Sequence, residues 1–277
     1  MYIPELIRKA GLRRGLSHRT IKTYNDCVRK FFSICRKQPH EVKKQDVKDF
    51  LDRLIEKNRV GNTINVYLNA LNFFYSEVLN RKLMVNIRYS KTPKTVPTVL
   101  SKEEVMRLIE AIKNPKHKLM AKLIYSAGLR VSELVHLKRK DLELDKNFGW
   151  VRNGKGNKDR LFIIAESIKH ELTAHIAGED ISHESWLFKG QKHWHLTVKA
   201  VQNIIKDAAK KARIMKNVHP HTLRHSFATH LVENGYDVAS IQSLLGHNSL
   251  ETTMVYIHAA SPKMIAVQSP LDNMQTS

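Results

Sequence analysis

The chain has 277 residues and carries 47 Lys and Arg against 26 Asp and Glu, a formal charge of +21 at pH 7. Hydrophobic residues make up 42% and charged residues 26%, which is typical of a folded globular chain and excludes disorder as the main state. The positive excess indicates a polyanionic partner, most simply nucleic acid.

The first hundred residues have the pattern of a small helical bundle. Ser17 can cap a helix whose apolar residues follow a 3.6-residue stripe as far as Cys35. Further helices are predicted over Lys44–Lys57 and Gly61–Asn80, which together give about four helices with aromatic residues in the core. No part of this region contains a plausible catalytic cluster, so it is predicted to bind rather than react.

The two cysteines, Cys27 and Cys35, cannot build a disulfide framework or a four-cysteine zinc site. They predict buried thiols in a reducing cytoplasm. The first residues carry scattered charge without a long apolar core, and nowhere do about 18 apolar residues run together. The sequence therefore predicts neither a secretory signal nor a transmembrane span.

Residues 89–100 predict a linker between an N-terminal domain over 1–88 and a C-terminal domain over 101–277. The segment contains Pro93 and Pro97 together with two lysines, and prolines at this spacing forbid a helix. Residues 1–100 hold 21 Lys and Arg and 8 Asp and Glu, whereas the remaining residues hold 26 and 18. The smaller half therefore has the larger positive surplus, as expected of domains that wrap a duplex, although a solvated hinge would have a similar composition.

The second domain is predicted to be mainly α-helical with one small β-hairpin. Ser101 opens a capping box, and a helix follows over Lys116–Ala127. Two short strands over 148–153 and 160–164 flank a basic, glycine-containing turn. Helices dominate from about 196 to 258. The predicted fold class is mainly α with a small β-hairpin or sheet, that is, α+β.

Histidines are concentrated between Val218 and His230, with four in twelve residues. A zinc site is disfavoured because no cysteine or acidic residue lies near enough to complete it. In a helix that starts near His221, Arg224 lies one turn on and points to the same side, so the pair could grip one phosphate. The chain also lacks an acidic cluster for Mg²⁺ and a Walker loop, which disfavours metal-dependent nucleases and nucleotide-binding enzymes.

Several motifs taken together resemble the tyrosine recombinase, or phage-integrase, family. They are Arg130 in Gly-Leu-Arg-Val-Ser-Glu-Leu, the block from His221 to His230, the Leu245-Gly-His247 turn and Tyr256 nine residues beyond it. The Gly-Lys-Gly-Asn-Lys turn has Lys155 at the position of the family's catalytic lysine. The resemblance covers nearly the whole chain and is nearest to the compact Xer-type recombinases. The tail from about residue 259 departs from that pattern, since it has two prolines and little charge.

The resemblance implies an N-terminal SAM-like core-binding domain and a C-terminal catalytic domain. It implies six catalytic residues, which are Arg130, Lys155, His221, Arg224, His247 and the nucleophile Tyr256. In this scheme Tyr256 forms a 3′-phosphotyrosyl bond, Lys155 protonates the leaving 5′-oxygen and both arginines hold the phosphate. The counterpart of His221 assists as acid or base, and that of His247 stabilises the phosphate. Neither a cofactor nor a metal ion is implied.

The implied partner is a double-stranded DNA recombination site, bound by a dimer and brought into a tetrameric synapse. Base contacts are predicted from Asn62–Asn72 and Lys192–Lys206, although solvated polar faces would look the same. The implied task is resolution of chromosome or plasmid dimers through a Holliday junction, in the cytoplasm on the nucleoid and away from membranes. A mobile-element integrase, a type IB topoisomerase and a non-catalytic accessory protein remain alternatives, and the need for a translocase stays open.

Overall fold

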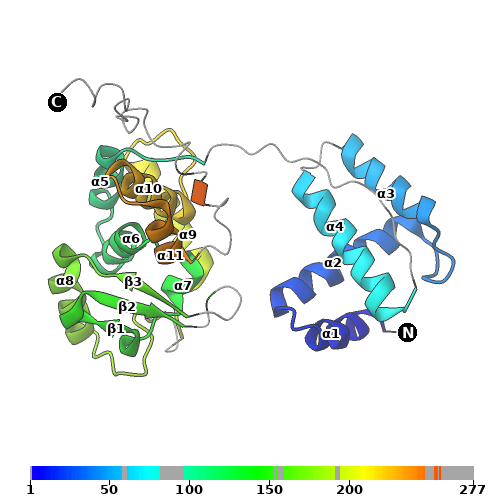
Figure 1. The fold of residues 1–277 in the computed structure, drawn as a ribbon, viewed down its shortest axis with the longest axis horizontal. Helices are drawn as coiled ribbons and strands as arrows, with labels where there is room; N and C mark the ends of the chain where they lie inside the picture. The colour runs from blue at the N-terminus through cyan, green and yellow to red at the C-terminus, as the bar shows by residue number, and fades with distance from the viewer. Residues whose placement is uncertain are drawn as a thin grey trace, which may run out of the picture. The chain divides into compact units, whose positions relative to one another are not determined.

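The computed structural model describes residues 2–57, 61–81, 97–152, 154, 159–190, 194–246, 253, 254 and 256. The chain forms two compact units, Met1–Lys94 and Thr95–Ser277 (Figure 1). Each unit buries a core of its own. Most of the predicted linker, residues 89–96, lies outside the described residues, so the exact domain limits stay a prediction.

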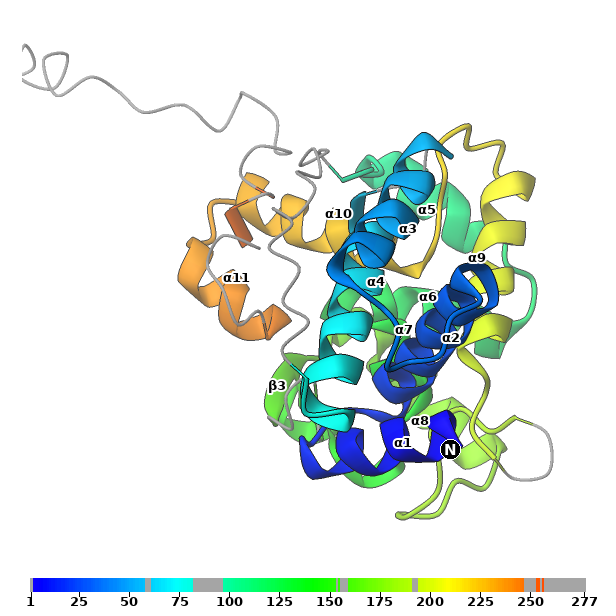
Figure 2. The ribbon, with the colours of Figure 1, turned by 90° about the vertical axis from the view of Figure 1, so that its right-hand side faces the viewer.

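The first unit is a helical bundle, as predicted. Its elements are α1 (Ile3–Arg13), α2 (His18–Cys35), α3 (Lys44–Glu56), α4 (Gly61–Phe73) and the π-helical turn η1 (Phe74–Val78). The Ser17 hydroxyl accepts a hydrogen bond from the Thr20 N–H at 3.1 Å, which starts α2 at the predicted cap. Helix α4 packs against α2 and α3, and Figure 2 shows α3 and α4 side by side.

The end of this bundle differs from the prediction. The α-helix expected to reach Asn80 ends at Phe73, and η1 continues it with wider turns. The Leu79 N–H donates to the Phe74 carbonyl at 3.1 Å, five residues back. Phe74 and Tyr75 are both fully buried in the core, so tertiary packing accounts for a turn that helical periodicity does not predict.

Aromatic packing fills the core of the first unit. Phe31 and Phe50 meet edge to face, with ring centroids 5.2 Å apart. The aromatic residues therefore belong to the core, as predicted. Cys27 and Cys35 are free thiols, the first buried and the second partly buried. Burial raises the pKa of Cys27 to about 11, which keeps that thiol protonated and unreactive.

The second unit is mainly helical with one small sheet, as predicted. Its helices are α5 (Lys102–Glu110), α6 (Pro115–Ala127), α7 (Val131–Val135), α8 (Glu166–Gly178), α9 (Val198–Lys211), α10 (Pro220–Glu233) and α11 (Val238–Leu245). Ser101 caps α5 in the predicted capping box. Helix α6 ends at Gly128, where a left-handed φ of 59° suits glycine.

Three antiparallel strands form the sheet in the order β1-β2-β3. They are β1 (Leu142–Glu143), β2 (Phe148–Val151) and β3 (Arg160–Ile163), with the 3-10 turns η2 (Arg139–Asp141) and η3 (Leu144–Lys146) around β1. The predicted hairpin is confirmed as β2 and β3, in the register that pairs Val151 with Arg160. Sequence reasoning missed β1 because two residues are too few to show alternation.

Helix α6 lies at the centre of the second unit and packs against α5, α8 and α10 (Figure 1). Five of its residues from Leu119 to Ile124 are almost completely buried, so the helix forms part of the core on more than one side. This rigid base supports the turn after Gly128, from which the first site residue projects. No helix in the described part of the chain is long and apolar enough to cross a membrane.

Candidate active site

Arg130 lies in the turn between α6 and α7. Gly128 permits this turn, because a Cβ there would lie 2.5 Å from the Phe227 ring. The Arg130 backbone N–H donates to Glu133 Oε2 at 2.9 Å, and its Nη1 donates to Glu133 Oε1 at 2.6 Å. Its Nη2 also donates to the Gly246 carbonyl at 3.2 Å. The guanidinium is therefore held at both ends and partly open to solvent.

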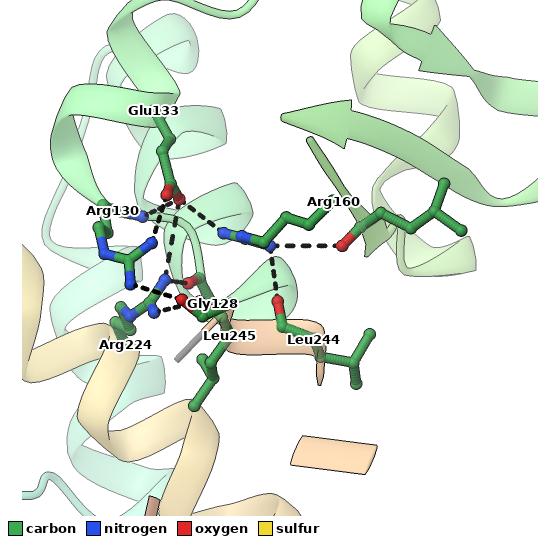
Figure 3. Close-up of polar contacts among 9 residues, drawn as sticks. Gly128, Arg130, Glu133, Arg160, Arg224, Leu244 and Leu245 are labelled. Carbon is green, nitrogen blue, oxygen red and sulfur yellow. Dashed lines mark hydrogen bonds and ion pairs between the residues drawn. The ribbon is translucent and has the colours of Figure 1, made fainter. Parts of the chain in front are cut away.

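Arg224 projects from α10 toward the same place and is almost fully buried. Its Nη1 donates to the Gly128 carbonyl and its Nη2 to the Leu245 carbonyl at 2.6 Å (Figure 3). Both carbonyls are at helix C-termini, where the partial negative charge of the helix dipole suits a cation. Burial, followed by the charge of Arg130, lowers the pKa of Arg224 below its ordinary value. Because burial and Arg130 disfavour the positive charge of Arg224, an anion placed beside this guanidinium would be attracted to it.

Glu133 connects the arginines and was not identified from the sequence. Its carboxylate lies 2.6 Å from Arg130 Nη1, 2.6 Å from Arg160 Nη2 and 3.8 Å from Arg224 Nη1. Burial alone would raise the pKa of Glu133, but Arg160 and Arg130 outweigh it and the pKa lies below its ordinary value. Three guanidinium groups thus share one ionised carboxylate, and the cluster keeps an excess of positive charge.

Arg160, the first residue of β3, was also missed. Its Nη1 donates to the Leu244 carbonyl at 2.6 Å, while Nη2 binds Glu133 (Figure 3). The side chain is only 10% exposed. A Cβ at Gly246 would lie 2.5 Å from Arg160 Cδ, so the arginine stem requires glycine there. The only sequence signal was its position five residues after Lys155 in the same hairpin.

Tyr256 is 3% exposed and lies beside α10 in the hydrophobic cluster that includes Phe227. Its hydroxyl is 3.0 Å from His225 Nδ1, and the two rings are tilted with centroids 5.6 Å apart. Burial raises the pKa of Tyr256, and the charges of Arg224 and Arg130 act against that increase. The phenol is thus protonated at neutral pH but lies in the field of both arginines.

The histidines in α10 and at its N-cap differ in their exposure and in their contacts. His221 is exposed, and its ring centroid is 6.3 Å from that of His225. His219 caps the helix, because its Nδ1 accepts from the Thr222 N–H at 3.3 Å. His230 Nδ1 pairs with the Tyr125 hydroxyl at 2.8 Å. Among the described residues, no three His, Cys, Asp or Glu side chains gather into a group that could hold a metal ion.

The structure brings together four of the six predicted residues. Arg130, His221, Arg224 and Tyr256 lie around one end of α10. Although His221 reaches solvent, the protein atoms around its imidazole partly desolvate it, and this desolvation followed by the charge of Arg224 lowers the pKa of His221. The other two, Lys155 and His247, lie outside the described residues. The described group offers two guanidinium groups, an imidazole and a phenol, which are suited to binding and attacking a phosphodiester.

Comparison with known proteins identifies the family. Residues 98–262 match the phage integrase family, and residues 5–84 match its N-terminal SAM-like domain. This chain belongs to the phage integrase family. The resemblance found in the sequence and the predicted fold are therefore confirmed, with a SAM-like first domain and an integrase catalytic domain.

Individual family members match most of the chain. The tyrosine recombinase of Thermosipho africanus is 36% identical over 266 residues, covering 91% of this chain and 92% of that protein. Tyrosine recombinase XerA of Pyrococcus furiosus is 38% identical over 248 residues, covering 87% and 84%. A crystal structure of the XerH site-specific recombinase, bound to palindromic difH substrate in a post-cleavage complex, is similar with a TM-score of 0.74 and 25% identity. That likeness covers 95% of this integrase-family chain and 82% of the XerH chain.

Proposed function

We propose that this protein is a site-specific DNA recombinase that cuts and rejoins strands through a bond between Tyr256 and a 3′-phosphate. The observation that carries the proposal is the buried phenol of Tyr256 beside the guanidinium groups of Arg130 and Arg224. Membership of the phage integrase family and the Xer-type names of its relatives support the same activity.

The chemistry follows from the charges at the site. A phosphodiester resists attack because it is negative and gains further charge in the transition state. Arg130 and Arg224 can hold its non-bridging oxygens and offset that charge, since their own partners leave a positive excess. His221 adds a hydrogen bond or a proton at the solvent side. Tyr256 then attacks phosphorus.

Lys155 and His247 complete the proposed set by family resemblance. Lys155 protonates the departing 5′-oxygen, and His247 stabilises the phosphate. The phosphotyrosine conserves the energy of the broken bond, so the 5′-hydroxyl of another strand can reverse the reaction without ATP. Because arginine side chains can supply the charge that a metal ion supplies elsewhere, we expect the reaction to proceed without metal.

The proposed task is Xer-like resolution of chromosome or plasmid dimers through a Holliday junction. The relative named XerA and the XerH complex with difH support this choice. In the proposal the domain 1–88 grips DNA, the linker 89–100 spans the duplex and the domain 101–277 reacts. We expect a dimer on one site, a tetramer in the synapse and a location on the nucleoid in the cytoplasm. An integrase of a mobile element would use the same chemistry on other sites.

Covalent trapping tests the proposal. Immobilised Tyr256→Phe protein first selects binding sequences from a random duplex pool, and duplexes of the selected sequence are made with a nick at each position in turn. We expect the wild type to give a protein-linked 3′ end on a denaturing gel in the presence of EDTA. Tyr256→Phe should bind the same duplexes without forming that product.

Two controls make the outcome decisive. Tyr236→Phe alters an exposed tyrosine and should still form the covalent product. Salt-sensitive binding without any covalent product would favour the non-catalytic accessory protein. A plasmid with two selected sites then separates recombination from topoisomerase activity, because exchange between the sites requires strands to change partners whereas relaxation does not.

A further inference from the structure

The nucleophile's hydroxyl is bound to a histidine outside the predicted catalytic set. Tyr256 Oη and His225 Nδ1 are 3.0 Å apart, a hydrogen-bond distance. His225 follows Arg224 on α10 and is partly buried. By contrast His221, the histidine expected to assist as acid or base, is exposed to solvent, one turn earlier on the same helix.

The surroundings of His225 keep the imidazole neutral. Burial, followed by the charges of His221, His219 and Arg224, lowers the pKa of His225 to about 4. A neutral imidazole has one nitrogen with a proton and one with a free lone pair. With the proton on Nε2, Nδ1 is free to accept the hydrogen bond of the Tyr256 hydroxyl.

We propose that His225 is a further catalytic residue, whose Nδ1 accepts the phenolic proton as Tyr256 attacks the phosphate. This inference rests on the proposed function, in which Tyr256 is the nucleophile. In the step, the Oη–H bond of Tyr256 breaks and its proton moves to His225 Nδ1. The Oη–P bond forms while the P–O5′ bond breaks, and the 5′-oxygen takes a proton from Lys155. The reverse reaction returns both protons.

Substrate binding should make His225 a better base. The cations that keep it neutral in the free protein include Arg224, which binds the phosphate in the proposed mechanism. An anionic phosphate bound to Arg224 offsets the repulsion between Arg224 and an imidazolium ion at position 225, so protonation of His225 becomes less costly. Proton acceptance by His225 then depends on bound DNA. In the free enzyme Tyr256 therefore keeps its proton and stays a weak nucleophile.

The test compares two histidines of one helix. His230 forms the same type of contact with Tyr125, at 2.8 Å between Nδ1 and the hydroxyl, and takes no part in the proposed reaction. His225→Gln and His230→Gln are assayed for single-turnover cleavage of the selected nicked duplex at saturating protein. We expect His225→Gln to cleave about 100-fold more slowly at neutral pH with unchanged DNA affinity. His230→Gln should cleave at nearly the wild-type rate.

Changing the acidity of the nucleophile separates proton transfer from positioning. 3-Fluorotyrosine placed at position 256 has a lower phenol pKa than tyrosine. At a pH below that pKa, each unit by which the pKa falls raises the phenolate fraction about tenfold. We expect it to accelerate His225→Gln about tenfold and to leave the protein with His225 almost unchanged. The rate of His225→Gln should also keep rising with pH after the wild-type rate has levelled.

Each outcome has one meaning. Loss of rate in His225→Gln without rescue by fluorination or higher pH would overturn proton acceptance and leave a positioning role. A normal rate in His225→Gln would overturn any role. Should that variant fail to fold, a strong response of the wild type to fluorination would refute the inference. Failure of the wild type itself to form the covalent product would instead refute the proposed function.

Discussion

At the residue scale, the carboxylate of Glu133 is the main counter-charge of the site. It is 7% exposed and contacts the guanidinium groups of Arg130 and Arg160, with Arg224 at 3.8 Å. Breaking a buried ion pair by removing one partner leaves the other charge without compensation. Glu133 is therefore expected to affect both the stability of the domain and the positions of the arginines proposed to bind phosphate.

Glu133→Gln is expected to destabilise the second unit by about 3–5 kcal/mol at neutral pH, because three guanidinium groups, those of Arg160 and Arg224 largely buried, lose their shared anion. The folded pKa of Glu133 lies below its ordinary value, so its stabilising effect is present above the ordinary pKa and is lost as pH falls through the folded one. The gap between wild type and variant should therefore close in acid. Urea unfolding monitored across the pH range measures it.

Glu184→Gln is the control for this comparison. Glu184 also contacts two cations, Lys138 and Lys140, but its side chain is 63% exposed and its pairs lie in water. We expect a much smaller change in the urea midpoint at neutral pH. Equal losses in the two variants would show that burial of Glu133 among the arginines has no special effect.

At the scale of elements, backbone carbonyls at helix ends assemble the site. The end of α11 supplies the carbonyls of Leu244 and Leu245 to Arg160 and Arg224, and the end of α6 supplies Gly128. The strand β3 contacts α11 directly, so the positions of the sheet and of the C-terminal end of α11 depend on each other. Movement of one helix end would displace arginines from two other elements.

Gly246→Ala is expected to disrupt this junction. The residue has a left-handed φ of 62°, and a new Cβ would lie 2.5 Å from Arg160 Cδ. Gly235→Ala is the matched control, since it has a φ of 86° and no atom within 4 Å of its Cβ. In both variants the left-handed conformation of alanine lowers the stability by about 1–2 kcal/mol. Only Gly246→Ala also displaces Arg160.

Thermal unfolding and single-turnover cleavage together check this prediction. We expect Gly246→Ala to melt at a lower temperature than Gly235→Ala and to lose cleavage. Gly235→Ala should retain cleavage. A similar loss in both variants would mean that strain alone, and not the contact with Arg160, sets the effect.

Local signals predicted much of the fold and part of the site. The caps at Ser17 and Ser101 were predictable because each depends on residues within one turn. The contact between Arg160 and Glu133 joins positions 27 apart, and that between Arg130 and Gly246 joins positions 116 apart. Such pairs leave no periodic trace in a single sequence, so the motifs contained the proposed nucleophile and two of the arginines but gave no sign of these long-range contacts.

At the scale of the whole molecule, charge dominates the expected behaviour toward DNA. The formal charge of +21 is distributed over both halves, with the larger surplus in the first hundred residues. Neutralising phosphates with Lys and Arg releases counterions, so binding weakens as salt rises. Affinity should therefore depend on salt far more than the chemical step does.

The affinity of Tyr256→Phe for the selected duplex is expected to fall about a thousandfold or more between 50 and 200 mM salt, as for proteins with several phosphate contacts. Fluorescence anisotropy over a salt series measures the slope. The single-turnover rate of wild type at saturating protein is the control and should change little, because in the proposed mechanism the site arginines already hold the phosphate of bound DNA. A DNA affinity that does not change with salt concentration would contradict a role for the excess of Lys and Arg in binding.

The long-range contacts of the arginines also bear on protein synthesis. Arg130 reaches a carbonyl 116 residues later in the chain, and Arg224 reaches one 96 residues earlier. During synthesis the first unit, whose core contains only its own residues, leaves the ribosome long before Gly246, the distant partner of Arg130, is made. A half-made chain can therefore fold the first bundle but cannot yet assemble the arginine cluster of the candidate site.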